Sequence, residues 1–158
     1  MKVLTIIGAT LGGFFAVLVL ALVYVDSVAP EIFIYPGKQV PRKYISEIRY
    51  LDLIEVEEKI KYFYSDALFD VKEGMYFVTD QNLVLYSKIW ENPKFIVPLE
   101  EITNVEACYD DSFFADSYIY VETVDGWELS FPLSSEQKRD RSFVAYLEKN
   151  MRPGGKAE

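Results

Sequence analysis

The chain opens with an apolar run that contains no charged side chain between Val3 and Val25. As an α-helix this run would be roughly 34 Å long at ~1.5 Å per residue, enough to cross the ~30 Å hydrocarbon core of a bilayer with some tilt. A secretory signal has a shorter apolar region of ~7–15 residues. We therefore predict that residues 1–25 form a retained membrane-spanning helix, with residues 3–25 in the membrane; a cleaved signal and a buried core helix are the alternatives.

Small residues recur at four-residue spacing within this run, at Gly8, Gly12 and Ala16. They would share one helix face, and small residues allow two membrane helices to pack closely. Glycine is also frequent in membrane helices for other reasons, so a homodimer through this face is one of two interpretations. The excess of Lys and Arg after the run, compared with Lys2 before it, favours a cytoplasmic position for the rest of the chain.

Residues 26–41 contain three prolines and one glycine. Because proline disrupts both helices and sheet ladders, we expect a juxtamembrane linker without a helix or a strand. Its apolar stretch 32–35 would lie either at the bilayer surface or against an apolar patch of the domain. The near-helical apolar spacing that follows predicts a short helix over residues 42–53.

Between residues 58 and 132 the period changes to that of strands. Seven short runs rich in Ile, Val, Tyr and Phe are each bounded by turn residues, and Thr79–Asn82 and Val124–Trp127 are typical hairpin turns. A helix is then predicted over residues 135–151, with Ser134 and Gln137 as a capping box. Its apolar stripe is formed by Phe143, Val144, Leu147 and Met151. Residues 153–158 remain as a tail, so residues 42–152 form one predicted domain.

Two phrases within this domain resemble those of bacterial pleckstrin-homology-like (PH-like), GRAM-like domains. "VTDQNLVLYS" (Val78–Ser87) is similar to their hairpin, and "IVPLEEITNVE" (Ile96–Glu106) to their passage between the fourth and fifth strands. The resemblance covers roughly residues 55–151 and implies a mainly β fold, a seven-stranded antiparallel sandwich or barrel capped by a C-terminal helix. Asn82 replaces an arginine found in many such domains, and no functional residue is transferred because this fold serves unrelated functions.

Charge and composition exclude several functions. The chain has a net charge of −9, and all of its acidic residues follow residue 25, so nucleic acid is a poor partner. Lys72 is the only base in the loop where related domains hold phosphoinositides, and we expect no such binding. Histidine is absent, and no nucleophile has a base beside it, so we predict neither an enzyme nor a cofactor. The single Cys108 lies in an apolar strand, and a buried side chain is expected there.

The aspartates at positions 110, 111 and 116 lack the spacing of a calcium-binding loop, and no metal site is predicted. Aromatic and apolar residues in three loops are better candidates for recognition: Leu68, Phe69, Trp90 and Trp127. The resemblance implies that these loops gather at one end of the sandwich, where an acidic rim would surround the aromatic side chains, as in protein-recognition sites. The other interpretation is that these side chains complete or cover the core.

The sequence therefore predicts a PH-like interaction module that is tethered to the membrane and recruits a protein partner there. The alternative is a structural or assembly subunit of a membrane complex, in which the helix face of Gly8, Gly12 and Ala16 makes the contacts.

Overall fold

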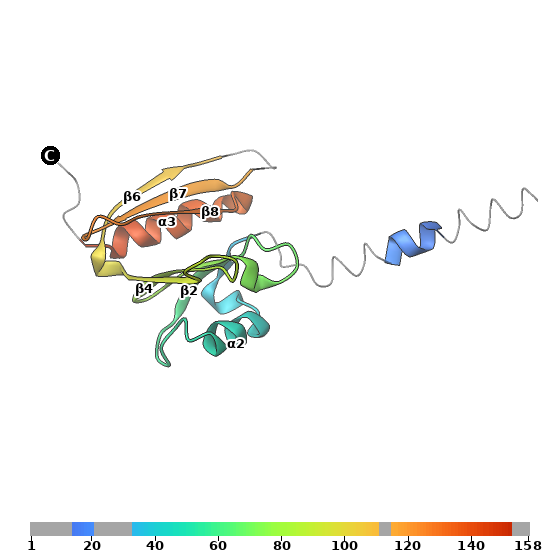
Figure 1. Ribbon diagram of the computed structural model, residues 1–158. Coiled ribbons are helices and arrows are strands. Elements are labelled where there is room, and N and C mark those ends of the chain that lie inside the picture. The colour runs from blue at the N-terminus through green and yellow to red at the C-terminus, as the bar shows by residue number, and fades with distance from the viewer. Residues whose placement is uncertain (1–13, 21–32, 111–114, 153–158) are drawn as a thin grey trace, which may run out of the picture.

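The computed structural model describes residues 14–20, 33–110 and 115–152 (Figure 1). Two antiparallel sheets form a sandwich, one of five strands in the order β1-β2-β3-β4-β5 and one of three in the order β6-β7-β8. The five-stranded sheet consists of β1 (Tyr35–Pro36), β2 (Ile60–Tyr64), β3 (Met75–Thr79), β4 (Asn82–Tyr86) and β5 (Lys94–Pro98). The three-stranded sheet consists of β6 (Ile102–Cys108), β7 (Ser117–Thr123) and β8 (Glu128–Leu133).

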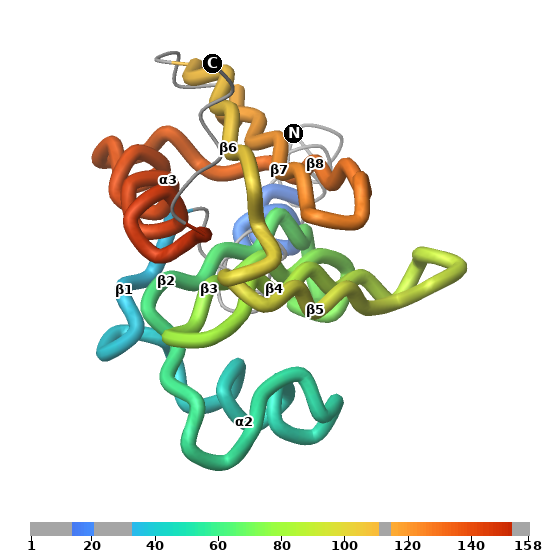
Figure 2. The backbone as a smooth tube through the Cα atoms, turned by 90° about the vertical axis from the view of Figure 1, so that its left-hand side faces the viewer, coloured from blue at the N-terminus to red at the C-terminus, as the bar shows by residue number. Residues whose placement is uncertain are grey.

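Two α-helices and four short 3-10 helices complete the domain, and the two α-helices lie on opposite sides of the five-stranded sheet (Figure 2). The α-helices are α2 (Arg42–Tyr50) and α3 (Arg139–Asn150), and the 3-10 helices are η1 (Gly37–Gln39), η2 (Val71–Glu73), η3 (Leu99–Glu101) and η4 (Glu136–Lys138). The predicted antiparallel sandwich with a C-terminal helical cap is thus confirmed. All seven predicted strands are present, as β2 to β8.

The eighth strand, β1, corrects the expectation that residues 26–41 contain no strand. Tyr35 and Pro36 pair with Phe63 and Tyr62 at the outer edge of the sheet, a position that tolerates the missing N–H of proline. Ile34 beside them is completely buried, and its carbonyl accepts a hydrogen bond of 2.8 Å from Nη1 of Arg139. The apolar stretch 32–35 was expected either at the bilayer surface or against the domain. Its described residues, 33–35, pack against the domain.

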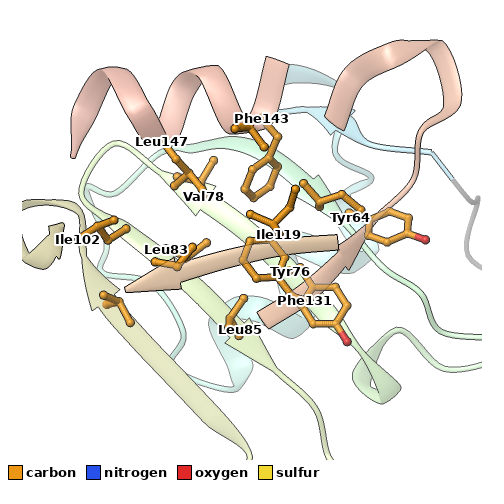
Figure 3. Packing of buried hydrophobic residues seen from close by; sticks show 14 of the residues in the cluster. Tyr64, Tyr76, Val78, Leu83, Leu85, Ile102, Ile119, Phe131, Phe143 and Leu147 are labelled. Atoms are coloured by element: carbon orange, nitrogen blue, oxygen red, sulfur yellow. The ribbon is translucent and has the colours of Figure 1, made fainter. Parts of the chain in front are cut away.

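The inner core fills the space between the two sheets and α3. Figure 3 shows side chains of the five-stranded sheet meeting those of the three-stranded sheet and of α3. The stripe predicted on the last helix is confirmed, because Phe143, Val144 and Leu147 are buried in this cluster. Further members are Tyr64, Tyr76, Val78, Leu83, Leu85, Ile102, Ile119 and Phe131.

A second core lies on the other face of the five-stranded sheet, under α2. Tyr44 and Ile48 of α2 pack there with Phe63 and Phe77, and the Tyr44 and Phe63 rings are stacked at 5.5 Å. As a result every residue of β3 is buried. A strand covered on both faces has a continuous apolar run instead of alternation, which explains the sequence of β3 and β4.

The last helix begins later than predicted, at Arg139, and the expected capping box does not form. Gln137 and Lys138 each have a φ of 56°, which breaks the helix before it starts. The buried carboxylate of Asp140 accepts a 2.7 Å hydrogen bond from Ser117 Oγ and holds the first turn of α3 on β7. Cys108, expected to be buried, is exposed on β6.

Residues 14–20 are helical. Within the ranges that the structure describes, no helix has both the length and the apolar character needed to cross a bilayer. Most of the predicted membrane segment, including Gly8 and Gly12, lies outside these ranges, and so does the tail 153–158.

The role of residues 33–40 can be tested with two fragments ending at Arg152, one starting at Phe33 and the other at Pro41. The shorter fragment should be less stable, because it loses Ile34, Tyr35 and Val40 from the two cores. Burial of one such aliphatic side chain contributes ~1.5–3 kcal/mol, and Arg139 would lose its acceptor. Urea unfolding followed by circular dichroism measures the difference; equal midpoints would show that β1 is dispensable.

Candidate functional site

Two loops of the five-stranded sheet are joined at one end of the sandwich. They connect β2 to β3 (residues 65–74) and β4 to β5 (residues 87–93). The backbone N–H of Lys88 donates to the carbonyl of Lys72 at 2.8 Å, and the hydroxyl of Ser87 donates to the carbonyl of Glu73. These backbone contacts fix the two loops relative to each other.

Charged side chains add to this junction. Lys88 Nζ lies 2.8 Å from Asp70 Oδ2 and 3.6 Å from Glu73 Oε1. Partial burial alone would raise the pKa of the Asp70 carboxyl, but the hydrogen bonds from Lys88 and from the Lys72 N–H outweigh it and lower the pKa. The hydrogen bond to Asp70 raises the pKa of Lys88. Because these side chains are about one-third exposed, the ion pair orients the loops more than it stabilises them.

Three large apolar side chains project into solvent from the joined loops. Leu68 is 64% exposed, Phe69 51% and Ile89 76%; we call these three residues the loop patch. The sequence pattern does not single out Ile89, because the apolar run 82–90 is typical of one strand; in the structure β4 ends at Tyr86, and Ile89 lies in the loop. Exposed apolar side chains that cluster on a fixed surface are typical of interaction sites.

Trp90 follows the loop patch in the chain but turns inward. Its ring lies 6.4 Å from that of Tyr76 and 6.0 Å from that of Phe95, and it packs against the inner core. No ring contact links it to Phe69 among the residues that the structure describes. Trp90 therefore covers the core at the base of the loop, as the second interpretation expected for it.

Trp127 lies elsewhere, in the hairpin between β7 and β8. The hairpin turns at Gly126, whose φ of 78° suits glycine, and its Val124 N–H donates to the carbonyl of Glu101 at 2.8 Å. Glu101 comes after β5, whereas the loop patch lies before it. Trp127, 64% exposed, lines a pocket of about 220 Å³ together with Phe95 and Leu129. The structure thus brings together two of the three predicted loops and places the third at the opposite end of β5.

Two phenol–carboxylate pairs lie behind the first loop. Tyr64 donates to Asp116 Oδ2 at 2.7 Å, and Tyr76 donates to Asp66 Oδ2 at 3.0 Å. Burial raises the pKa of both phenols, and it also raises the pKa of the Asp66 carboxyl despite the hydrogen bond from Tyr76. The first pair ties the end of β2 to the residue before β7, and the second ties the first loop to β3.

The predicted absence of a metal site at the aspartates stays a prediction, because Asp111 lies outside the described ranges. Within those ranges, no group of three or more acidic or cysteine side chains is arranged to hold a metal ion. Asp116 is occupied by its hydrogen bond with Tyr64.

With this geometry established, comparison with known proteins assigns the chain. The model of the GRAM domain family matches residues 50–153. The chain belongs to this family. The matched range covers β2 to β8 and α3; β1, η1 and nearly all of α2 precede it.

Two solved bacterial structures are similar to the GRAM domain described here. One is a DUF1696 family protein with a pleckstrin-homology domain from Shewanella loihica PV-4, with 17% identity over 67% of this chain and 91% of that chain and a TM-score of 0.49. The other is a pleckstrin-homology domain from Shewanella amazonensis SB2B, with 13% identity over 67% and 86% of the two chains and a TM-score of 0.48. No curated protein matches the chain.

The Asp66 carboxyl provides a test of the electrostatics behind the loop patch. Because the folded state raises its pKa, the charged form costs stability above that pKa, and the cost disappears as pH falls below the unfolded value of about 3.9. The substitution Asp66→Asn keeps an acceptor for Tyr76 and should raise the melting temperature slightly at pH 7. Thermal melts at pH 7 and about pH 3.5 should show the two proteins converging at the lower pH. A variant that is less stable at both values would contradict this account.

Proposed function

We propose that this GRAM domain is a protein-interaction module and that the loop patch is its recognition surface. The observation that carries the proposal is the exposure of Leu68, Phe69 and Ile89 on loops that hydrogen bonds hold in place. A pre-ordered surface loses little conformational entropy on binding, so its apolar contacts contribute more to affinity. The acidic side chains beside it, Asp66 and Glu91, would form a polar rim.

The charges at this end of the sandwich favour a protein over a lipid headgroup. Lys72 lies 3.6 Å from Glu47 and 4.0 Å from Asp70, and Lys88 pairs with Asp70 and Glu73. Both cations of the joined loops are therefore already neutralised by carboxylates. A phosphate would have to displace these carboxylates and would lie close to them.

The second part of the proposal is that residues 1–25 tether the domain to a membrane, on the cytoplasmic side. A tether raises the effective concentration of the domain near other membrane-bound proteins, so that a modest patch is sufficient for binding. The support is the uncharged run from Val3 to Val25. A complex built through Gly8, Gly12 and Ala16 is the alternative, and no described contact favours it.

The tether predicts that the first 25 residues remain in the mature protein. Intact-mass measurement of protein extracted from membranes should give the full chain, because the apolar run is longer than a signal and Pro30 follows the small residues before it. A mass that starts near Pro30 or Glu31 would show that the run is a cleaved signal. Washing the membranes at alkaline pH, which should leave the protein in the pellet, is the control.

The loop patch predicts that Phe69→Ala weakens partner binding by ~10-fold or more, the effect of a lost hot spot, with a nearly unchanged melting temperature. A photoreactive amino acid at Leu68 should crosslink a partner in native membranes, and Phe69→Ala in the same chain should reduce that crosslink. Tyr50→Ala is the matched control, because Tyr50 is 83% exposed and lies outside the patch.

Trp90→Ala should behave differently and lower the melting temperature, since Trp90 packs on Tyr76 and Phe95. If Phe69→Ala also unfolds the domain, the patch is structural. If the crosslink at Leu68 is unaffected by Phe69→Ala, the recognition surface lies elsewhere.

A further inference from the structure

A groove between α2 and the start of β2 gathers positive charge in an otherwise acidic chain. It has a volume of about 600 Å³, and four cationic side chains line it: Lys38, Arg49, Lys59 and Lys61. The whole chain has 16 Lys and Arg against 25 Asp and Glu, so a lining with four cations and one carboxylate departs from its overall charge. We call this feature the α2 groove.

The one acidic residue in its lining, Glu58, forms no ion pair with these cations in the described ranges. Glu58 is 5% exposed, and both of its carboxylate oxygens accept hydrogen bonds inside the protein. Its Oε1 accepts hydrogen bonds from the Thr79 hydroxyl and, at 2.8 Å, from the Asn82 side-chain amide. Its Oε2 accepts a hydrogen bond from the Glu55 N–H at 2.9 Å.

The four cations differ in the charges nearest to them. Lys61 pairs with Asp80 at 3.7 Å, and Asp80 also interacts electrostatically with Lys59, whose backbone N–H donates to it at 2.9 Å. Lys38 and Arg49 form no ion pair with any residue in the described ranges. In a chain with surplus carboxylates, cations that remain unpaired and converge on one groove create a positive potential there, which attracts an anionic partner.

The walls of the groove are held in place by close backbone packing. Gly37 lies so near β2 that an added Cβ would be 1.9 Å from the carbonyl oxygen of Ile60. This contact fixes η1, and with it Lys38, against the strand that carries Lys61 and that begins directly after Lys59. Arg49 comes from the last turn of α2, which the second core holds on the sheet through Tyr44 and Ile48.

The chemistry of the lining distinguishes a carboxylate from a phosphate ligand. The groove is also lined by Ile45, Ile54 and Ile60, which are half-buried and pack against the second core. Phosphate sites typically rely on converging backbone N–H groups or on a helix N-terminus, whereas α2 contributes the side chain of Arg49 from its last turn. Apolar surface flanked by separate point charges suits a chain that carries carboxylates and apolar side chains together.

We propose that the α2 groove binds an acidic, apolar peptide segment of the partner protein. The inference rests on the proposed function as a protein-interaction module, and it names the chemistry of the partner. The residues that line the groove, 36–61, include none of the loop patch, and Lys38 and Arg49 precede the range matched by the GRAM model. The α2 groove would thus be a second binding surface for the partner, and the segment before the matched range would supply part of it.

The test uses the full chain in a neutral detergent and a short fluorescein-labelled peptide of alternating glutamate and leucine, followed by fluorescence anisotropy. We expect binding that weakens as salt rises, because the rim charges are exposed. Lys59→Glu and Arg49→Glu should each weaken it by ~10-fold or more. Lys149→Glu, the same charge change on the exposed face of α3, is the matched control and should bind like the unchanged chain.

Further probes separate the possible ligands. A lysine–leucine peptide and a glutamate–serine peptide should bind poorly, and inorganic phosphate and vesicles with anionic lipid should not compete. The proposal is overturned if the glutamate–leucine peptide does not bind, if Lys59→Glu and Lys149→Glu act alike, or if phosphate or anionic vesicles displace the peptide. None of these variants changes the loop patch, so the two proposals fail separately. If the peptide does not bind but the Leu68 crosslink forms, only the α2 groove proposal is refuted. If the crosslink fails while the peptide binds, only the loop patch is refuted as the recognition surface.

Discussion

Burial of the five-stranded sheet on both faces is the constraint on which the rest of the structure depends. Its inner face meets the three-stranded sheet and α3, and its outer face meets α2 and the segment before it. Neither face would be excluded from water without its cover, and each buried aliphatic side chain contributes ~1.5–3 kcal/mol. The hydrogen bond from Arg139 to the Ile34 carbonyl links the two covers across the edge of the sheet. Residues 33–54 are therefore an integral layer of the domain.

This layered core explains why the loops can serve as a binding surface. The strands are fixed from both sides, and the loops that join them are tied to each other through Lys88 and Glu73. Val71 and Trp90 of these loops pack against the two cores, whereas the side chains of the loop patch remain in solvent. The same outer layer creates the α2 groove, because η1 packs closely on the start of β2 at Gly37 and residues of α2 line the groove beside it.

The distribution of charge follows from the same arrangement. Carboxylates on the joined loops and on α2 pair with Lys72 and Lys88. The cations of the α2 groove lie beside apolar side chains and a carboxylate that is bonded internally, and of these cations Lys61 also pairs with Asp80. One domain can thus repel polyanions at long range through its net charge and still attract an acidic segment at short range. Long-range repulsion decays within ~10 Å at ordinary ionic strength, so contacts within a groove depend on local charges.

The sequence by itself determined the strands, the hairpin at Asp125 and Gly126, and the buried stripe of the last helix, because alternation, turn residues and helical spacing are local properties of the chain. It also pointed to Leu68 and Phe69. It could not place Trp90 and Trp127, whose exposure depends on side chains distant in sequence such as Tyr76 and Phe95. Nor could it reveal β1 or the α2 groove: Lys38, Arg49 and Lys59 are ordinary charges along the chain, and only packing of the N-terminal layer on β2 brings them together.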